Sequence, residues 1–181
     1  MTKENIFLRR LRAVIFTMAW VLILGSSVFC AEAQLKFSLI LEKAEYSTDE
    51  PINVVFSLKN LGVGPVMVNQ RFYISDQKAA KNQKEVYFDL ISPTGAKLPC
   101  KYFYETGYPK TEYFKLLAPN DEAKSEYPRN LKGYFEMAEP GTYTVTAVYQ
   151  NVFGAEIGLD TFKGQLVSAP VKFRIVNTKN K

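Results

Sequence analysis

The sequence predicts an all-β protein, a single antiparallel β-sandwich of seven to nine strands that follows an N-terminal signal peptide. Three observations support this prediction. Short runs of alternating apolar and polar residues recur along the chain, and Gly, Pro, Asn or Asp bounds each run. After the first 33 residues, no segment keeps a helical period of apolar residues long enough to compete. The N-terminal segment is basic and then apolar, which is typical of a secretory signal.

The signal peptide is predicted over residues 1–33. The basic stretch "MTKENIFLRRLR" precedes the apolar run "AVIFTMAWVLILGSSVF", and Ala31 and Ala33 supply the small residues that signal peptidase needs, so we expect cleavage after Ala33. Export to the periplasm or the cell exterior follows. Two alternatives stay open: an uncleaved anchor, since about 20 apolar residues can span a bilayer, and a lipoprotein acylated at Cys30, although Phe29 is larger than the residue that should precede such a cysteine.

Cleavage would leave a mildly basic, one-domain protein. Removing four basic and two acidic residues lowers the formal charge from +5 to +3 over the remaining 148 residues. No clustered Lys/Arg face predicts nucleic-acid binding. Cys100 would be the one remaining cysteine, so no internal disulfide is expected and stability must come from packing. We expect a monomer.

The first four strands are predicted from period-two alternation. The run 35–42 places Leu35, Phe37, Leu39 and Leu41 on one face, and the run 52–60 does so with Ile52, Val54, Phe56 and Leu58. The turn "YSTDEP" separates them. A third strand, 66–72, follows "LGVGP", and a fourth, 85–91, lies between the polar loop "SDQKAAKNQK" and the turn "SPTG".

The second half begins with an irregular, aromatic-rich segment and then returns to strands. We expect strands at 122–131, at about 141–150 and at 164–176, with a short aromatic stretch "GYFEM" before the second of them. Neither an internal repeat nor a linker divides the chain. The predicted sandwich therefore spans residues 34–176, and residues 177–181 form a polar tail.

The stretch "EPGTYTVTAVYQ" predicts structural roles for Gly141 and Tyr143. An acidic residue, then Gly, then Tyr at alternate positions is the pattern of the tyrosine corner in immunoglobulin-like sandwiches, where the Tyr hydroxyl ties the crossover loop to the strand. Alternation places Tyr143 on the inward face with Val145, Ala147 and Tyr149. We therefore expect Tyr143 to be buried rather than to contact a ligand.

Several segments together resemble a known family. The stretches "AEYSTDEPINVVFSLKNLGVGPVMV", "VYFDLISPTG", "LLAPNDE" and "PGTYTVTA" occur in the same order in bacterial immunoglobulin-like domains, and the pattern resembles the intracellular proteinase inhibitor domain of bacilli. A looser similarity extends to macroglobulin-type and fibronectin-like envelope domains. The resemblance covers most of residues 37–150. It implies an immunoglobulin-like fold and protease inhibition; the export signal and the position of Trp20 within that signal depart from the family pattern.

The residues needed for common catalytic chemistry are missing. The chain has no histidine, which removes the usual general base and metal ligand, and Cys100 alone cannot hold zinc. Carboxylates at Asp89, Asp121, Glu122 and Asp160 leave open a two-carboxylate glycan-active enzyme, but their contexts favour solvated surface charges. Calcium binding by "PNDE" (119–122) is a further alternative. We predict a protein that is not an enzyme, with no cofactor and no metal.

The segment Cys100–Phe114 has the composition of a recognition surface. Its predicted ligand-binding residues are Tyr104, Tyr108, Tyr113, Lys101 and Lys110. Alternation cannot turn all of its aromatic rings toward one core, and exposed Tyr beside charge is typical of interfaces. The alternative is a crossover packed over the end of the sandwich. Cys100 is interpreted as a small buried hydrophobe, or as a thiol activated by Lys97 and Lys101.

The predicted function is an exported, non-catalytic binding or accessory module of the cell envelope. Its partner would be another envelope or extracellular protein, or a glycan; protease inhibition and a glycan-active enzyme are the alternatives. The charge run Lys78, Lys81 and Lys84 is interpreted as keeping its loop soluble, with a phosphate or polyanion site as the alternative.

Overall fold

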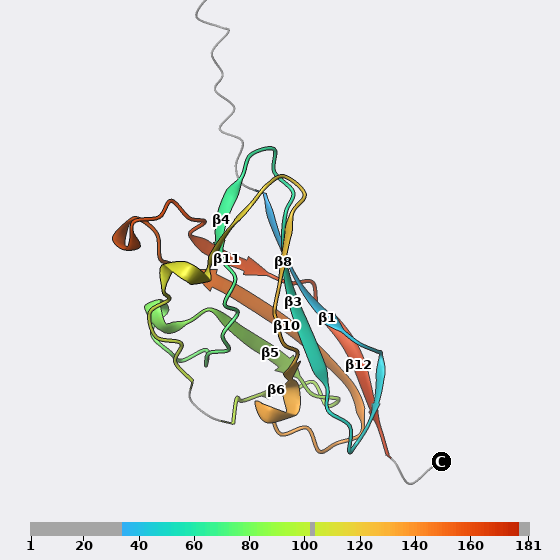
Figure 1. The fold of residues 1–181 in the computed structure, drawn as a ribbon. Coiled ribbons are helices and arrows are strands. Elements are labelled where there is room, and N and C mark those ends of the chain that lie inside the picture. The colour runs from blue at the N-terminus through green and yellow to red at the C-terminus, as the bar shows by residue number, and fades with distance from the viewer. Residues whose placement is uncertain (1–33, 102–103, 178–181) are drawn as a thin grey trace, which may run out of the picture. The chain divides into compact units, whose positions relative to one another are not determined.

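The computed structural model describes residues 34–101 and 104–177. These residues form twelve β-strands and four single-turn 3-10 helices, with no α-helix among them, and the strands pair almost entirely antiparallel (Figure 1). The predicted all-β sandwich is confirmed. The strand number exceeds seven to nine because two predicted strands are each divided in two and three short strands were not predicted: Glu45–Ser47, which overlaps the predicted turn "YSTDEP", Lys97–Leu98 and Phe114–Leu117. None of the described residues belongs to a helix with the length and apolarity to cross a membrane. The predicted signal peptide and residues 178–181 lie outside the described residues.

The first sheet is built around β3. Its strands are β1 (Leu35–Leu41), β3 (Asn53–Asn60), β8 (Glu122–Lys124) and β9 (Arg129–Asn130). β1 pairs with β3 from Leu35 opposite Asn60 to Leu41 opposite Val54. The strand predicted at 122–131 is two strands, since the intervening segment contains Pro128, which has no N–H to donate to a ladder.

The second sheet is centred on the longest strand, β10. Its strands are β2 (Glu45–Ser47), β5 (Val86–Ile91), β6 (Lys97–Leu98), β10 (Gly141–Asn151), β11 (Gly164–Val167) and β12 (Val171–Val176). β11 and β12 both pair with the same edge of β10, one after the other. The predicted strand 164–176 is thus interrupted at Ser168–Pro170, where the Ser168 hydroxyl accepts a hydrogen bond from the backbone N–H of Ala147 at 3.0 Å.

A third, two-stranded sheet extends the sandwich. It pairs β4 (Val66–Asn69) with β7 (Phe114–Leu117), so the strand predicted at 66–72 ends at Asn69. The four 3-10 helices are η1 (Lys81–Gln83), η2 (Thr111–Tyr113), η3 (Leu131–Gly133) and η4 (Ala155–Ile157). The stretch "GYFEM" (133–137) forms no strand, and its first residue, Gly133, ends η3.

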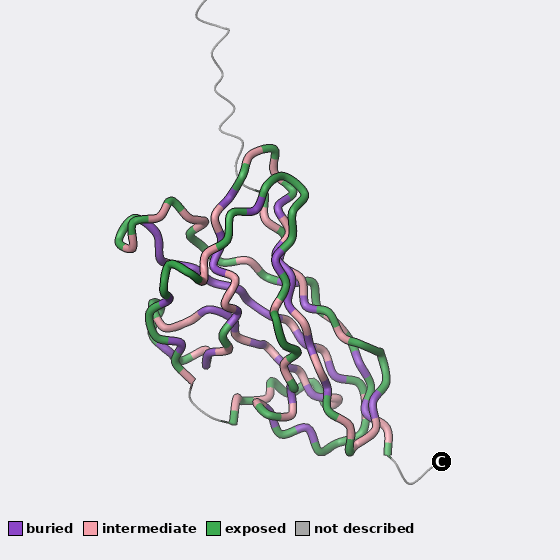
Figure 2. The backbone as a smooth tube through the Cα atoms, in the orientation of Figure 1, coloured by how far each residue is buried: buried purple, intermediate pink, exposed green. Residues whose placement is uncertain are grey.

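The core lies between the facing sides of the two larger sheets, and the buried segments of the tube in Figure 2 follow these strands. The alternation predicted for three strands is confirmed, since their inward residues are buried: Val54, Phe56 and Leu58 of β3, Val86, Phe88 and Leu90 of β5, and Tyr143, Val145, Ala147 and Tyr149 of β10. At the predicted tyrosine corner, Tyr143 is buried and its hydroxyl donates to the carbonyl oxygen of Glu139 at 2.8 Å. Gly141 is required at its position, since its φ is +138° and an added Cβ would lie 2.6 Å from Pro93.

Candidate functional site

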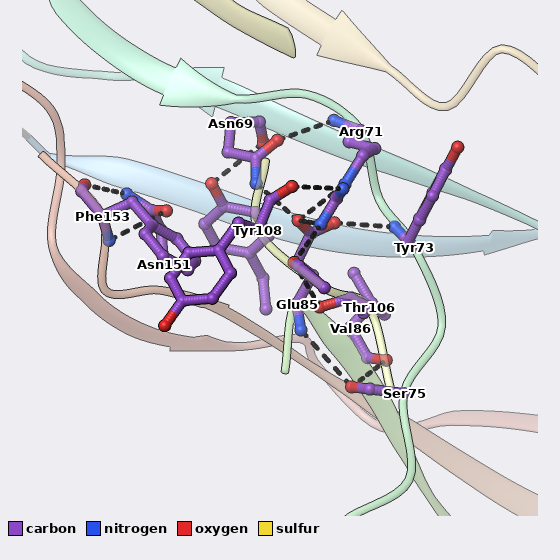
Figure 3. Close-up of polar contacts among 12 residues, drawn as sticks. Asn69, Arg71, Tyr73, Ser75, Glu85, Val86, Thr106, Tyr108, Asn151 and Phe153 are labelled. Atoms are coloured by element: carbon purple, nitrogen blue, oxygen red, sulfur yellow. Dashed lines mark hydrogen bonds and ion pairs between the residues drawn. The ribbon is translucent and has the colours of Figure 1, made fainter. Parts of the chain in front are cut away.

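The best-organised surface on the molecule surrounds a buried ion pair between Arg71 and Glu85. Glu85 immediately precedes β5, and its carboxylate accepts four hydrogen bonds (Figure 3). Arg71 donates two of them, with Nε at 2.8 Å, and the Asn69 side chain and the Tyr73 backbone N–H donate the others, at 2.8 and 3.0 Å. The two charged side chains are only 6% and 1% exposed. Both oxygens of the buried carboxylate therefore have protein donors, three at Oε1 and one at Oε2.

The backbone after β4 explains how Arg71 reaches this position. The chain leaves the β4–β7 pair at Asn69, and Phe72 adopts a left-handed conformation with φ of +49°. This turn buries the Phe72 ring completely in the core, while Arg71 and Tyr73 lie on the side of Glu85, just before β5. A non-glycine residue rarely adopts a positive φ, and here burial of an aromatic ring offsets the strain.

Arg71 also fixes the loop that contains Tyr108. Its Nη2 donates to the carbonyl oxygen of Gly107 at 3.0 Å, and its Nη1 donates to that of Tyr108 at 3.4 Å. The guanidinium carbon lies 4.4 Å from the ring centroid of Tyr73 and 5.3 Å from that of Tyr113. We call Tyr73, Tyr108 and Tyr113 the tyrosine surface, since all three contact the same arginine.

Tyr108 is the most prominent member of the tyrosine surface. It is 69% exposed, yet its ring packs edge-on against buried Phe153 with the centroids 5.4 Å apart. Its hydroxyl accepts a hydrogen bond from the Asn82 side chain at 3.2 Å. Contacts at the backbone, the ring and the hydroxyl therefore orient a side chain that is mostly in solvent.

The structure divides the predicted ligand-binding residues between two places. Tyr108 and Tyr113 belong to the tyrosine surface, and Lys110 is exposed nearby in sequence, 3.7 Å from Glu112. Tyr104 packs against Tyr134 instead, with ring centroids 5.5 Å apart.

Lys101 lies with Tyr104 near Tyr134. Its backbone N–H donates to the carbonyl oxygen of Tyr134, and its ammonium binds the Lys132 carbonyl at 3.0 Å and the Glu136 carboxylate at 2.9 Å. The alternative of a packed crossover therefore fits the end of the segment at Lys101 and Tyr104, and the alternative of exposed aromatic rings fits the end at Tyr108.

The residues Arg71, Tyr73 and Glu85 were not predicted from the sequence. The one sequence signal for them was a charged residue inside the strand-like run "VMVNQRF".

The candidate carboxylates do not converge. Burial would raise the pKa of Asp89, but the ammonium of Lys97 and the amide of Gln77 outweigh it and hold that pKa below its usual value. Asp121 closes its own turn by accepting the N–H of Ala118 at 3.1 Å. In the described part of the chain, no group of three or more Cys, Asp or Glu side chains is placed to hold a metal ion.

Cys100 is half-buried and lines a cavity of about 290 Å³. The cavity is also lined by Asp76 and Lys97.

Comparison with models of known protein families finds no match, and no curated protein matches the chain.

Proposed function

We propose that this chain is an exported, non-catalytic binding module of the cell envelope, and that its ligand contacts the tyrosine surface. The observation that supports this most strongly is Tyr108, a large aromatic side chain that is mostly exposed and yet held in one orientation. Side chains that only complete a core are not presented to solvent in this way. Tyrosine is enriched at interfaces because it offers apolar area together with a hydroxyl.

The surroundings of Tyr108 reduce the entropic cost of binding. Residues 104–110 of its loop pair with no described strand, but Arg71 holds two consecutive carbonyl oxygens of that loop. Because the charge of Arg71 is neutralised by Glu85, the guanidinium acts here as a rigid support for Tyr73 and Tyr113. A ligand would meet rings that are already ordered, so little rotamer freedom is lost on association.

The test compares two exposed tyrosines. Tyr108→Ala removes the proposed contact, and Tyr127→Ala is the matched control, because Tyr127 is 59% exposed in the turn between β8 and β9. The immobilised protein is presented with purified envelope glycans and envelope proteins, and retained ligand is quantified. We expect Tyr108→Ala to weaken retention by more than about 1 kcal/mol, as hot-spot truncations do, and Tyr127→Ala to leave it unchanged.

The stability of the two variants is measured alongside. Because most of the Tyr108 ring is in solvent, its truncation should cost less than the roughly 3–5 kcal/mol typical of core aromatics. Equal effects of both substitutions on retention, or a core-sized loss of stability for Tyr108→Ala, would argue against a recognition role.

The two alternative functions remain separable by experiment. Protease inhibition, which the family resemblance implies, predicts loss of protease activity at stoichiometric ratio across a panel of proteases. A glycan-active enzyme predicts new reducing ends when the protein is incubated with polysaccharides. A binding module predicts neither result.

A further inference from the structure

A hollow of about 490 Å³ lies at the end of β10 where β11 pairs with it. Its lining residues are Lys81, Gln150, Asn151, Val152, Lys163, Gly164 and Gln165. Gln150 follows Tyr149, whose ring is buried in the core, so alternation along β10 turns the Gln150 side chain to the opposite, outer face of the sheet. The volume is in the range of small-ligand sites.

Side-chain amides and a hydroxyl form a connected chain along this hollow. Gln150 donates from Nε2 to the carbonyl oxygen of Lys81 at 2.5 Å and accepts at Oε1 from Gln165 Nε2 at 2.5 Å. Gln165 Nε2 also donates to the Tyr87 hydroxyl at 3.3 Å. Both hydrogens of the Gln165 amide are then used. Among the described residues, the Gln165 carbonyl oxygen remains available to accept one hydrogen bond from a ligand, and the Tyr87 hydroxyl remains available to donate one.

The hollow is also positively charged. Lys81 and Lys163 line it, and the Lys84 ammonium lies 5.5 Å from the centroid of the Tyr87 ring. Lys163 pairs with Glu156 at 3.0 Å, whereas Lys81 and Lys84 form no ion pair within the described ranges. Three lysines and one glutamate leave a local charge of +2. Two of the three lysines of the charge run, Lys81 and Lys84, therefore lie beside these hydrogen-bonding groups, whereas Lys78 lines the cavity of Cys100.

We propose that this hollow binds an acidic oligosaccharide, with sugar carboxylates at Lys81 and Lys84 and sugar hydroxyls at Gln165 and Tyr87. The inference rests on the proposed binding function and names its ligand class. A sugar hydroxyl both donates and accepts, so it can satisfy the free carbonyl oxygen of Gln165 and the free hydroxyl hydrogen of Tyr87 together. An ionised carboxylate by itself only accepts, so a ligand group of that kind would leave the Gln165 carbonyl oxygen without a donor.

The hollow is linked to the tyrosine surface through η1. Asn82 follows Lys81 in η1 and donates to the Tyr108 hydroxyl at 3.2 Å. Tyr108 packs on Phe153, two residues after the Asn151 that lines the hollow. An oligosaccharide that leaves the hollow toward η1 therefore meets the exposed Tyr108 ring, against which the C–H face of a sugar can pack.

The test uses three probes of equal length: hexagalacturonate, neutral maltohexaose and hexaglutamate. Binding to protein expressed from the full 181-residue sequence is measured by calorimetry at fixed low salt. We expect hexagalacturonate to bind about tenfold or more tighter than either other probe. Lys81→Gln should weaken this binding about fivefold, which is the size of effect expected for one screened charge.

Two further variants locate the site. Lys172→Gln removes the same charge from β12, where Lys172 pairs with Thr144, about 20 Å along β10 from Gln150, and it should leave the affinity unchanged. Gln165→Ala removes the exposed amide without changing charge and should weaken hexagalacturonate binding about threefold or more.

Four results would overturn the inference: equal binding of hexaglutamate, equal binding of maltohexaose, equal effects of Lys81→Gln and Lys172→Gln, or no binding of hexagalacturonate. The retention assay with Tyr108→Ala is independent of these four results. If the native protein retains a ligand that Tyr108→Ala loses, the proposed function stands with a different ligand class. If no ligand depends on Tyr108, the proposed function is wrong as well.

Discussion

Replacing Arg71 with Met tests the buried ion pair that supports the tyrosine surface. Met keeps a flexible apolar side chain but removes the charge and all of the donors. In the native protein the Glu85 carboxylate accepts four hydrogen bonds, and two of them come from Arg71. The variant would retain only the bonds from Asn69 and the Tyr73 backbone and would leave an uncompensated charge that is 1% exposed. Breaking a pair of this kind costs about 3–5 kcal/mol.

The ion pair between Lys43 and Glu50 provides the control. Its atoms are 2.8 Å apart, as in a good salt bridge, but the two side chains are 47% and 42% exposed. Lys43→Met should therefore lower the free energy of unfolding by less than about 1 kcal/mol. Since the chain's one tryptophan lies at position 20, within the predicted signal, urea unfolding is best followed by circular dichroism.

A double-mutant cycle then separates the pair from its surroundings. Arg71→Met with Glu85→Met removes both charges, and the double variant should be less destabilised than the sum of the single variants by at least about 2 kcal/mol. Amide hydrogen exchange in residues 106–110 should accelerate in both variants that lack Arg71, because that side chain holds the carbonyls of Gly107 and Tyr108. If Arg71→Met cost no more than Lys43→Met, or if exchange in this loop were unchanged, the reasoning would be refuted.

Three further substitutions test the scaffold. Tyr143→Phe removes the hydroxyl of the tyrosine corner and should lower the free energy of unfolding by about 1 kcal/mol in chemical denaturation. Gly141→Ala should cost more than that, about 1–3 kcal/mol, because of its positive φ and the contact with Pro93. The Ser57 hydroxyl donates a hydrogen bond to the Glu122 carboxylate and lowers its pKa. The stability that this bond contributes is present at neutral pH and is lost as the pH falls through the lowered pKa. Ser57→Ala should therefore raise the Glu122 pKa in an NMR titration, and an unchanged titration would contradict this.

The residues of each strand that face the core were predictable, because inward and outward positions follow from local alternation. Tyr143 and Tyr149 occupy inward positions of β10 and are buried, as the period of two requires. Interruptions within a predicted strand were harder to read. At the break, the Ser168 hydroxyl accepts the hydrogen bond from the Ala147 N–H that a backbone carbonyl would accept in a continuous ladder. This bond forms only when β10 already lies beside Ser168, so local sequence does not predict it.

The tyrosine surface depends on information that alternation does not carry. Arg71 and Glu85 are 14 residues apart, and their contact requires the left-handed backbone at Phe72. Nothing in the residue type of Phe72 predicts that conformation, because the strain is compensated only by burial in the assembled core. The same limit applies to Tyr104 and Tyr108, since the segment that holds them is irregular and has no period to separate buried from exposed rings.

The energetics of the ion pair favour a role in shaping the loop over a role in stability. A buried pair is often no more stabilising than apolar residues of similar volume, because desolvation of two charges offsets their attraction. Apolar side chains at these positions, however, would donate nothing to the carbonyls of Gly107 and Tyr108, which are in a loop outside any ladder. Arg71 therefore supplies the bonds that a neighbouring strand would otherwise supply. If Tyr108 contacts the ligand, loss of Arg71 should weaken binding by releasing the loop even though its own charge is neutralised.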